Sequence, residues 1–166
     1  MRKASYILIV LFCFNNLVSR AQSNYGIKKI RAFYTERLPG NIPVDQNGNS
    51  LYKGPDTLIT IYAEISGKGP EWKTAWYHNV SYTVSSSLVL QTPYEAGTRA
   101  IDGKKVILKP AAGNKLWQLI LQKGNDKIKL PQKIRSGEIL LSGKYRDKNF
   151  LYKIGSLIQL TSLPSV

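Results

Sequence analysis

The stretch KVILKPAAGNKLWQLILQKGNDKIKL, residues 105–130, decides the predicted fold of this chain. Apolar and polar residues alternate along it with a period of two, which is the pattern of strands that bury one face. Glycine in the first place of Gly124-Asn125 favours a two-residue hairpin turn there, and residues 111–114 can form a second turn. The stretch therefore predicts an antiparallel meander with strands at 105–110, 115–123 and 126–130.

The predicted meander gathers its large apolar side chains on one face. Trp117, Leu119 and Leu121 point inward under both turns, although the two turns are inferred independently. A register shift of one residue would exchange the two faces, so this agreement supports the layout. The facing pairs that it predicts are Leu108 with Trp117, Val106 with Leu119, Leu119 with Leu130 and Leu121 with Ile128.

Alternation of the same kind recurs elsewhere, whereas no window after residue 21 has a convincing period of 3.6 residues. The segment 57–65 is the strongest case and places Ile59, Ile61, Ala63 and Ile65 on one face. Polar segments rich in glycine, asparagine and proline separate the strands. Further strands are predicted at 27–34, 75–84 and 88–90, long loops at 39–55 and 92–103, and a final hairpin of 138–145 with 150–158 that turns at 146–149 and pairs Leu141 with Ile154 and Gly143 with Tyr152.

These segments predict seven to nine short strands in one domain, residues 22–166. The pattern indicates an all-β fold, an antiparallel immunoglobulin-like β-sandwich, with a small β-barrel as the alternative. The cysteine pair of true immunoglobulin domains is missing, so the term describes architecture only.

Residues 1–21 have the composition of a cleavable signal peptide. Two basic residues precede an apolar run over 6–14, and Ser19-Arg20-Ala21 offers small residues two positions apart. The run is much shorter than the roughly 20 residues of a membrane-spanning helix, so we expect cleavage before Gln22 and no transmembrane span.

Cys13 is the only cysteine and lies inside the predicted signal, so the mature chain cannot form a disulfide. An exported chain without cysteine is typical of a bacterial envelope, because small eukaryotic secreted domains are commonly rich in disulfides. Phe12 stands where a lipoprotein signal needs a small residue, which argues against lipidation. We therefore expect a periplasmic or extracellular protein.

The formal net charge of +14 is concentrated in the second part of the chain. Residues 104–166 carry thirteen Lys and Arg against three Asp and Glu, whereas residues 22–103 carry eight against seven. Such asymmetry indicates a surface that attracts polyanions. Outside the cytoplasm the partner would be an acidic protein or an anionic glycan of the envelope, and no nucleic acid is expected.

The polar face of the meander is the predicted partner-binding surface. Lysines at strand spacing could follow anionic groups, with amide side chains between them as hydrogen-bond donors. Solvated lysines that protect a strand edge from aggregation are the alternative interpretation. The face is predicted to comprise Lys105, Lys109, Gln118, Gln122, Lys127 and Lys129, with Lys144 and Lys153 of the final hairpin.

Aromatic residues near the 66–70 loop suggest a second function, carbohydrate binding. Flat aromatic faces can stack on pyranose rings, and Trp72 and Tyr77 are the candidates. Alternation places Tyr77 opposite Trp76, and a tryptophan that packs over the end of the sandwich is the alternative interpretation for Trp72.

Enzymatic residues are sparse. His78 is the only histidine, and no catalytic serine, phosphate-loop or zinc motif is present. Glu64 and Glu71 are the acids that could meet across a loop to form a hydrolase site, which is the least favoured interpretation.

Asp45 begins a weak resemblance to a calcium loop, but such Asx-rich turns usually hydrogen-bond their own backbone. We expect no catalytic residue, metal or cofactor, and an exported, non-enzymatic binding or accessory module of the cell envelope.

Overall fold

The computed structural model describes residues 25–37, 44–51, 56–124 and 128–162, and the predicted signal peptide with Cys13 lies outside them. The described residues form an all-β fold, as predicted, with ten strands rather than seven to nine. No helix in these ranges is long and apolar enough to cross a membrane. The strands are β1 (Ile27–Arg37), β2 (Asp56–Ser66), β3 (Glu71–Tyr77), β4 (Val80–Leu88), β5 (Tyr94–Thr98), β6 (Lys105–Leu108), β7 (Asn114–Lys123), β8 (Ile139–Tyr145), β9 (Lys148–Ile154) and β10 (Leu157–Gln159).

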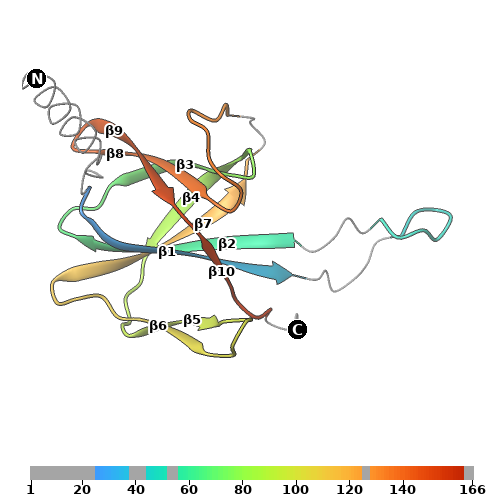
Figure 1. Ribbon diagram of the computed structural model, residues 1–166, viewed down its shortest axis with the longest axis horizontal. Coiled ribbons are helices and arrows are strands. Elements are labelled where there is room, and N and C mark those ends of the chain that lie inside the picture. Colours follow the sequence, from blue (N-terminus) through green and yellow to red (C-terminus); the bar gives the residue numbers. More distant parts are fainter. Residues whose placement is uncertain (1–24, 38–43, 52–55, 125–127, 163–166) are drawn as a thin grey trace, which may run out of the picture.

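Eight strands form one curled sheet in the order β10-β1-β2-β7-β4-β3-β8-β9, and β5 and β6 form a separate hairpin (Figure 1). β9 and β10 stand at opposite ends of this order, yet only Gly155 and Ser156 separate them in sequence. The sheet must therefore curl until its two ends approach, and β1 lies near β9 as a result. The two packed sheets of an immunoglobulin-like sandwich are not confirmed.

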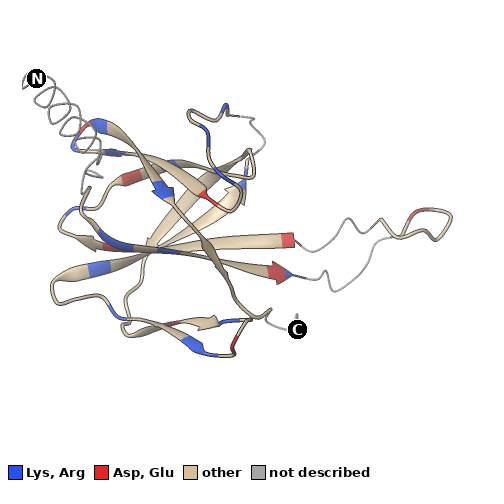
Figure 2. Ribbon diagram, in the orientation of Figure 1, with Lys and Arg blue, Asp and Glu red and all other residues tan. Residues whose placement is uncertain are grey.

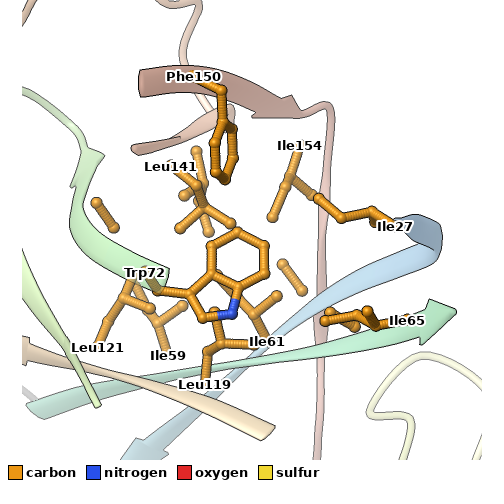
Figure 3. Close-up of a cluster of buried hydrophobic side chains, with 14 residues drawn as sticks. Ile27, Ile59, Ile61, Ile65, Trp72, Leu119, Leu121, Leu141, Phe150 and Ile154 are labelled. Atoms are coloured by element: carbon orange, nitrogen blue, oxygen red, sulfur yellow. The ribbon is translucent and has the colours of Figure 1, made fainter. Parts of the chain in front are cut away.

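The inner face of the curled sheet encloses the larger core cluster (Figure 3). Ile59, Ile61, Ala63 and Ile65 of β2 are almost completely buried in it, which confirms the predicted apolar face. Strand alternation brings one residue in two from each strand to this side. The burial of the aliphatic and aromatic side chains of the inner cluster is the main stabilising contribution to the sheet.

A second, smaller cluster lies on the outer face of the sheet, where the β5–β6 hairpin covers it. Val106 and Leu108 of β6 pack there against Phe33 of β1, Tyr62 of β2 and Leu116 of β7. Because both of its faces are covered, β2 buries even Tyr62 on the side opposite its isoleucines. The outer cluster therefore fixes the hairpin to the sheet.

The pairing predicted for the meander is wrong, and only the faces of β7 are right. Val106 and Leu108, predicted to share a face with Leu119, lie in the outer cluster instead. β7 pairs with β2 and β4, and β6 pairs with β5. Leu119 and Leu121 are buried in the inner cluster and Trp117 packs against it, as predicted. The outer side of β7 is also apolar at Leu116, and covering it requires β6 to lie on the sheet rather than beside β7.

The predicted strand at 126–130 is not formed by residues 128–130, and residues 126–127 lie outside the described ranges. Ile128 instead lies against the outer side of the β3–β4 hairpin. The Trp76 indole Nε1 donates a 3.0 Å hydrogen bond to the Ile128 carbonyl, and the Ile128 amide donates to Ser81 Oγ at 3.2 Å.

The predicted strand at 75–84 is wrong, because a hairpin turn at His78-Asn79 divides it into β3 and β4. Both turn residues have positive φ, 48° and 62°. The loop predicted at 92–103 contains β5.

The final hairpin is correct, but its turn has two residues, Arg146-Asp147, rather than four. The register differs from the predicted one by two residues, so that Gly143 faces Phe150 and Leu141 faces Tyr152. A shift of two preserves the side-chain faces.

Candidate functional site

The residues predicted to form one basic face are not brought together. β6 packs Val106 and Leu108 onto the outer cluster, so alternation places Lys105 on the side of β6 away from the sheet, whereas Lys109, just after β6, lines a cavity together with residues of β1 and β2. Gln118 of β7 instead belongs to the outer face of the sheet itself, where its amide donates to the Tyr62 hydroxyl at 3.2 Å. The predicted continuous surface is therefore divided between two layers.

The remaining predicted residues are dispersed further. Three of the predicted lysines have acidic neighbours: Lys105 Nζ lies 3.1 Å from Glu95 Oε2, Lys144 Nζ lies 3.1 Å from Asp147 Oδ1, and Lys153 Nζ lies 4.0 Å from Glu138 Oε2. Lys153 also donates to the Lys133 carbonyl at 3.3 Å, and Lys144 lines the cavity described below. Among the others, Gln122 and Lys129 are exposed, and Lys127 lies outside the described residues.

The aromatic residues predicted for carbohydrate binding are not an exposed platform. Trp72 is only 8% exposed and packs in the inner cluster, edge-on to Phe150 at 5.8 Å (Figure 3). Tyr77 is half-buried against the same cluster and stacks on His78 at 4.0 Å. Alternation explains the error, because Trp72 belongs to β3 and faces inward rather than standing in the preceding loop.

The two acids proposed as a hydrolase pair line different cavities. Glu64 is buried on the outer face of β2, and Glu71 is exposed at the start of β3.

The segment with the weak calcium-loop pattern forms an Asx turn: Asp45 Oδ1 accepts 2.8 Å hydrogen bonds from the backbone amides of Asn47 and Asn49. Hydrogen bonds from Asn49 lower the pKa of Asp45. Within the described ranges, no three His, Cys, Asp or Glu side chains form a group that could hold a metal ion.

A basic cavity lies at the end of the curled sheet where β1 begins, and we call it the end cavity. It has a volume of about 540 Å³. The beginning of β1, the loop from β2 to β3 and the β8–β9 turn surround it, and these segments lie together at the left of Figure 1. Its lining comprises Gly26, Lys28, Ser66, Gly67, Lys68, Gly69, Glu71, Lys144, Tyr145, Arg146 and Asp147.

Four cationic and two anionic side chains line the end cavity, so its lining is net positive. Lys144 Nζ lies 3.1 Å from Asp147 Oδ1. Within the described part of the chain, no ion pair joins Lys28, Lys68 or Arg146 to a carboxylate. Arg146 lies 5.4 Å above the Tyr145 ring, which leaves its guanidinium hydrogen-bond donors available.

A β-bulge explains how consecutive lysines of β1 reach different places. Ile27 pairs with Ile65, and Lys29 pairs with Glu64, so Lys28 is an extra residue with no partner on β2. A bulge bends the strand and redirects a side chain. Lys28 therefore lines the end cavity, whereas Lys29 lies on the outer face.

A second cavity, the side cavity, opens on the outer face between β1, β2 and β6. Its volume is about 160 Å³. The cations Lys29, Arg31 and Lys109 line it together with the buried carboxylate of Glu64. The side chain of Tyr62 and the apolar Ile107, Leu108, Pro110 and Leu116 complete the lining.

Glu64 is already satisfied within the side cavity. Its Oε1 accepts a 3.0 Å hydrogen bond from the Ala111 amide and another from the Asn114 side chain, and Oε2 lies 3.9 Å from Lys29 Nζ. The Ala111 hydrogen bond is the main reason that the pKa of Glu64 is lowered, against the opposing effect of burial. Its charge is therefore largely compensated, and Arg31 and Lys109 remain without an ion pair within the described residues.

Charge is unevenly placed along the molecule. Figure 2 shows Lys and Arg on the first half of β1 and around the β8–β9 turn, whereas acidic residues lie where β1 ends and β2 begins. The sequence prediction missed Lys28, Lys29, Arg31, Lys68 and Arg146. The adjacent Lys28 and Lys29 interrupt the alternation of the predicted first strand, and that interruption could have indicated the bulge.

No protein-family model matches this chain, and neither the curated proteins nor the solved structures compared with it include a similar one.

Proposed function

We propose that this protein is an exported, non-enzymatic binding module that holds an anionic partner at the end cavity. The observation that carries the proposal is the convergence of Lys28, Lys68 and Arg146 on one cavity with no carboxylate paired to any of them in the described chain. Unpaired cations in a concave site attract anions more strongly than cations scattered on a flat surface.

Two further features support this function. The signal-like composition of residues 1–21 favours export, which makes an envelope partner the relevant one. The single curled sheet favours a small, incompletely closed barrel over a sandwich, and the end of such a barrel is a common place for a binding site. No catalytic step is assigned, and His78 is exposed on the β3–β4 turn, outside the lining of the end cavity.

Binding to polygalacturonate, an anionic polysaccharide used as a probe, tests this function. Calorimetric titration of the protein should show an affinity that falls steeply with added sodium chloride, because salt screens exposed charges. The triple variant Lys28→Gln, Lys68→Gln, Arg146→Gln should bind at least about tenfold more weakly at low salt, since each lost ion pair contributes up to about 1 kcal/mol.

A matched control removes the same charge elsewhere. Arg37→Gln, Lys123→Gln, Lys133→Gln also replaces one arginine and two lysines, and none of these residues lines either cavity. Its affinity should stay within about threefold of the wild type, because distant charges are screened. If both triple variants bind equally weakly, net charge alone drives binding, and the end cavity is not the binding site.

A further inference from the structure

We infer that the partner is a linear acidic polysaccharide that runs from the end cavity along β1 into the side cavity. This inference rests on the proposed function and extends it from one anionic site to a continuous path. The path is defined by Lys28 at the end cavity, Lys29 and Arg31 on β1, and Lys109 at the side cavity.

The bulge on β1 is what joins the two cavities. Lys28 and Lys29 are adjacent in sequence, yet one lines the end cavity and the other lines the side cavity. A regular strand would place Arg31 on the same face as Lys29, two positions away, and the structure does so. Three cations thus follow one another along a single strand and lead from one cavity to the other.

The length of the path favours a polymer over a small anion as its occupant. A strand rises about 3.3 Å per residue, so Lys28 and Arg31 are separated by roughly 10 Å along β1, and they line different cavities. A single phosphate or uronate group held in one cavity leaves the cations of the other cavity unneutralised. A polymer with repeated anionic groups can neutralise cations at both cavities at once, and the effective concentration of the second group strengthens the complex.

The chemistry of the lining favours a polysaccharide over other polyanions. Nucleic acid strands are usually bound by exposed aromatic side chains that stack on bases. Here Tyr62 is buried, and Tyr145 is partly covered by Arg146 and lies edge-on to Tyr25. The end cavity instead offers Ser66 and the glycine backbone of Gly67 and Gly69, polar groups that suit sugar hydroxyls.

An acidic peptide fits this path less well. Protein interfaces are usually apolar at the centre and polar at the rim. Along β1 the path presents the cations Lys28, Lys29 and Arg31. Of the apolar residues that line the side cavity, Leu108 and Leu116 are buried and Ile107 of β6 is exposed. A hydrated, charged chain matches such a surface.

The test separates the side cavity from the end cavity. Arg31→Gln, Lys109→Gln leaves Lys29 in place as the neighbour of Glu64, so the fold should be retained, and thermal unfolding would verify this. This double variant should bind polygalacturonate roughly fivefold more weakly at low salt while its affinity for monomeric galacturonate is unchanged. The control Arg37→Gln, Lys123→Gln should leave both affinities unchanged.

Each outcome of this test supports or overturns a distinct statement. If the end-cavity triple variant weakens polymer binding and Arg31→Gln, Lys109→Gln does not, the continuous path is wrong and the proposed function stands. If neither affects binding, both are wrong. The protein could instead bind poly-glutamate or single-stranded oligothymidylate more tightly than polygalacturonate, with the same loss of affinity in the two variants. That result would overturn the polysaccharide as the partner.

Discussion

At the scale of single residues, Glu64 connects stability to the side cavity. It fastens the β6–β7 connection to the outer face of β2 through the Ala111 amide and the Asn114 side chain. The same contacts hold Pro110 and Leu116 in the wall of the cavity. A carboxylate in a basic surface would normally oppose anion binding, but here Oε1 accepts two hydrogen bonds from its own chain and Oε2 lies 3.9 Å from the Lys29 ammonium.

Replacing Glu64 should therefore cost stability in a pH-dependent way. Folding lowers the pKa of Glu64 below its ordinary value of 4.5, so its ionised form stabilises the fold above that value. This stabilisation is lost as the pH falls through the lower value of the folded state. Glu64→Gln should reduce the free energy of unfolding by about 1 kcal/mol near pH 7, because a charge-assisted hydrogen bond in a wet cavity becomes a neutral one.

Urea unfolding of both proteins at about pH 7 and about pH 2.5 measures this effect, and the difference should shrink toward zero at the lower pH. Glu95→Gln serves as a control, since Glu95 is exposed and should contribute within about 0.5 kcal/mol. A difference that stays constant with pH would contradict the assignment of the stabilising role to the ionised carboxylate.

At the scale of elements, the β3–β4 turn explains why a hairpin was missed from the sequence. His78 and Asn79 both adopt positive φ, and neither is glycine, so the alternation continues across the turn without a visible interruption. The turn is held in place by the Tyr77–His78 ring stacking and by the pairing of Tyr77 with Val80. Local turn chemistry alone could not show it.

Asn79→Gly should stabilise this hairpin. Glycine adopts positive φ without the steric cost of a side chain and is preferred in turns of this kind, so the free energy of unfolding should rise by about 0.5–1 kcal/mol. Asn79→Ala should lower it by about 1 kcal/mol, because alanine lacks the tolerance of asparagine for this region. Thermal unfolding midpoints measure both, and a lower midpoint for Asn79→Gly would show that the Asn79 side chain contributes more than its backbone conformation.

Strand faces were predicted better than strand partners, and β7 shows why. Its alternation places Leu119 and Leu121 inward in any pairing, because the period of two is a local property. Its neighbours, β2 and β4, are distant in sequence, and the alternation within β7 carries no information about which strands lie beside it. The end cavity could not be predicted from the sequence for the same reason. Its lining comes from the start of β1, the β2–β3 loop and the β8–β9 turn, and no local sequence pattern links these segments.

At the scale of the whole molecule, two clusters of unequal size divide the structure. The inner cluster contains fourteen buried residues and the outer cluster six. Leu160 belongs to the outer cluster, its amide donates to the Tyr34 carbonyl at 2.9 Å, and its side chain occupies the space that a side chain at Gly97 of β5 would need. One residue thus fixes the C-terminal end of the described chain to both β1 and the hairpin.

Leu160→Ala should open the hairpin without unfolding the sheet. Truncating a buried leucine lowers the stabilising free energy by about 2 kcal/mol or more. The outer cluster has fewer buried residues than the inner one, so this loss should make local opening of the hairpin easier before the whole sheet unfolds. Hydrogen exchange should become roughly tenfold faster or more for the amides of β5 and β6, whereas those of β8 should keep their protection. Leu90→Ala is the control, because Leu90 is 86% exposed and its loss should change neither rate. Equal acceleration in β8 would mean that both clusters open together, and the side cavity between hairpin and sheet would then be as stable as the core itself.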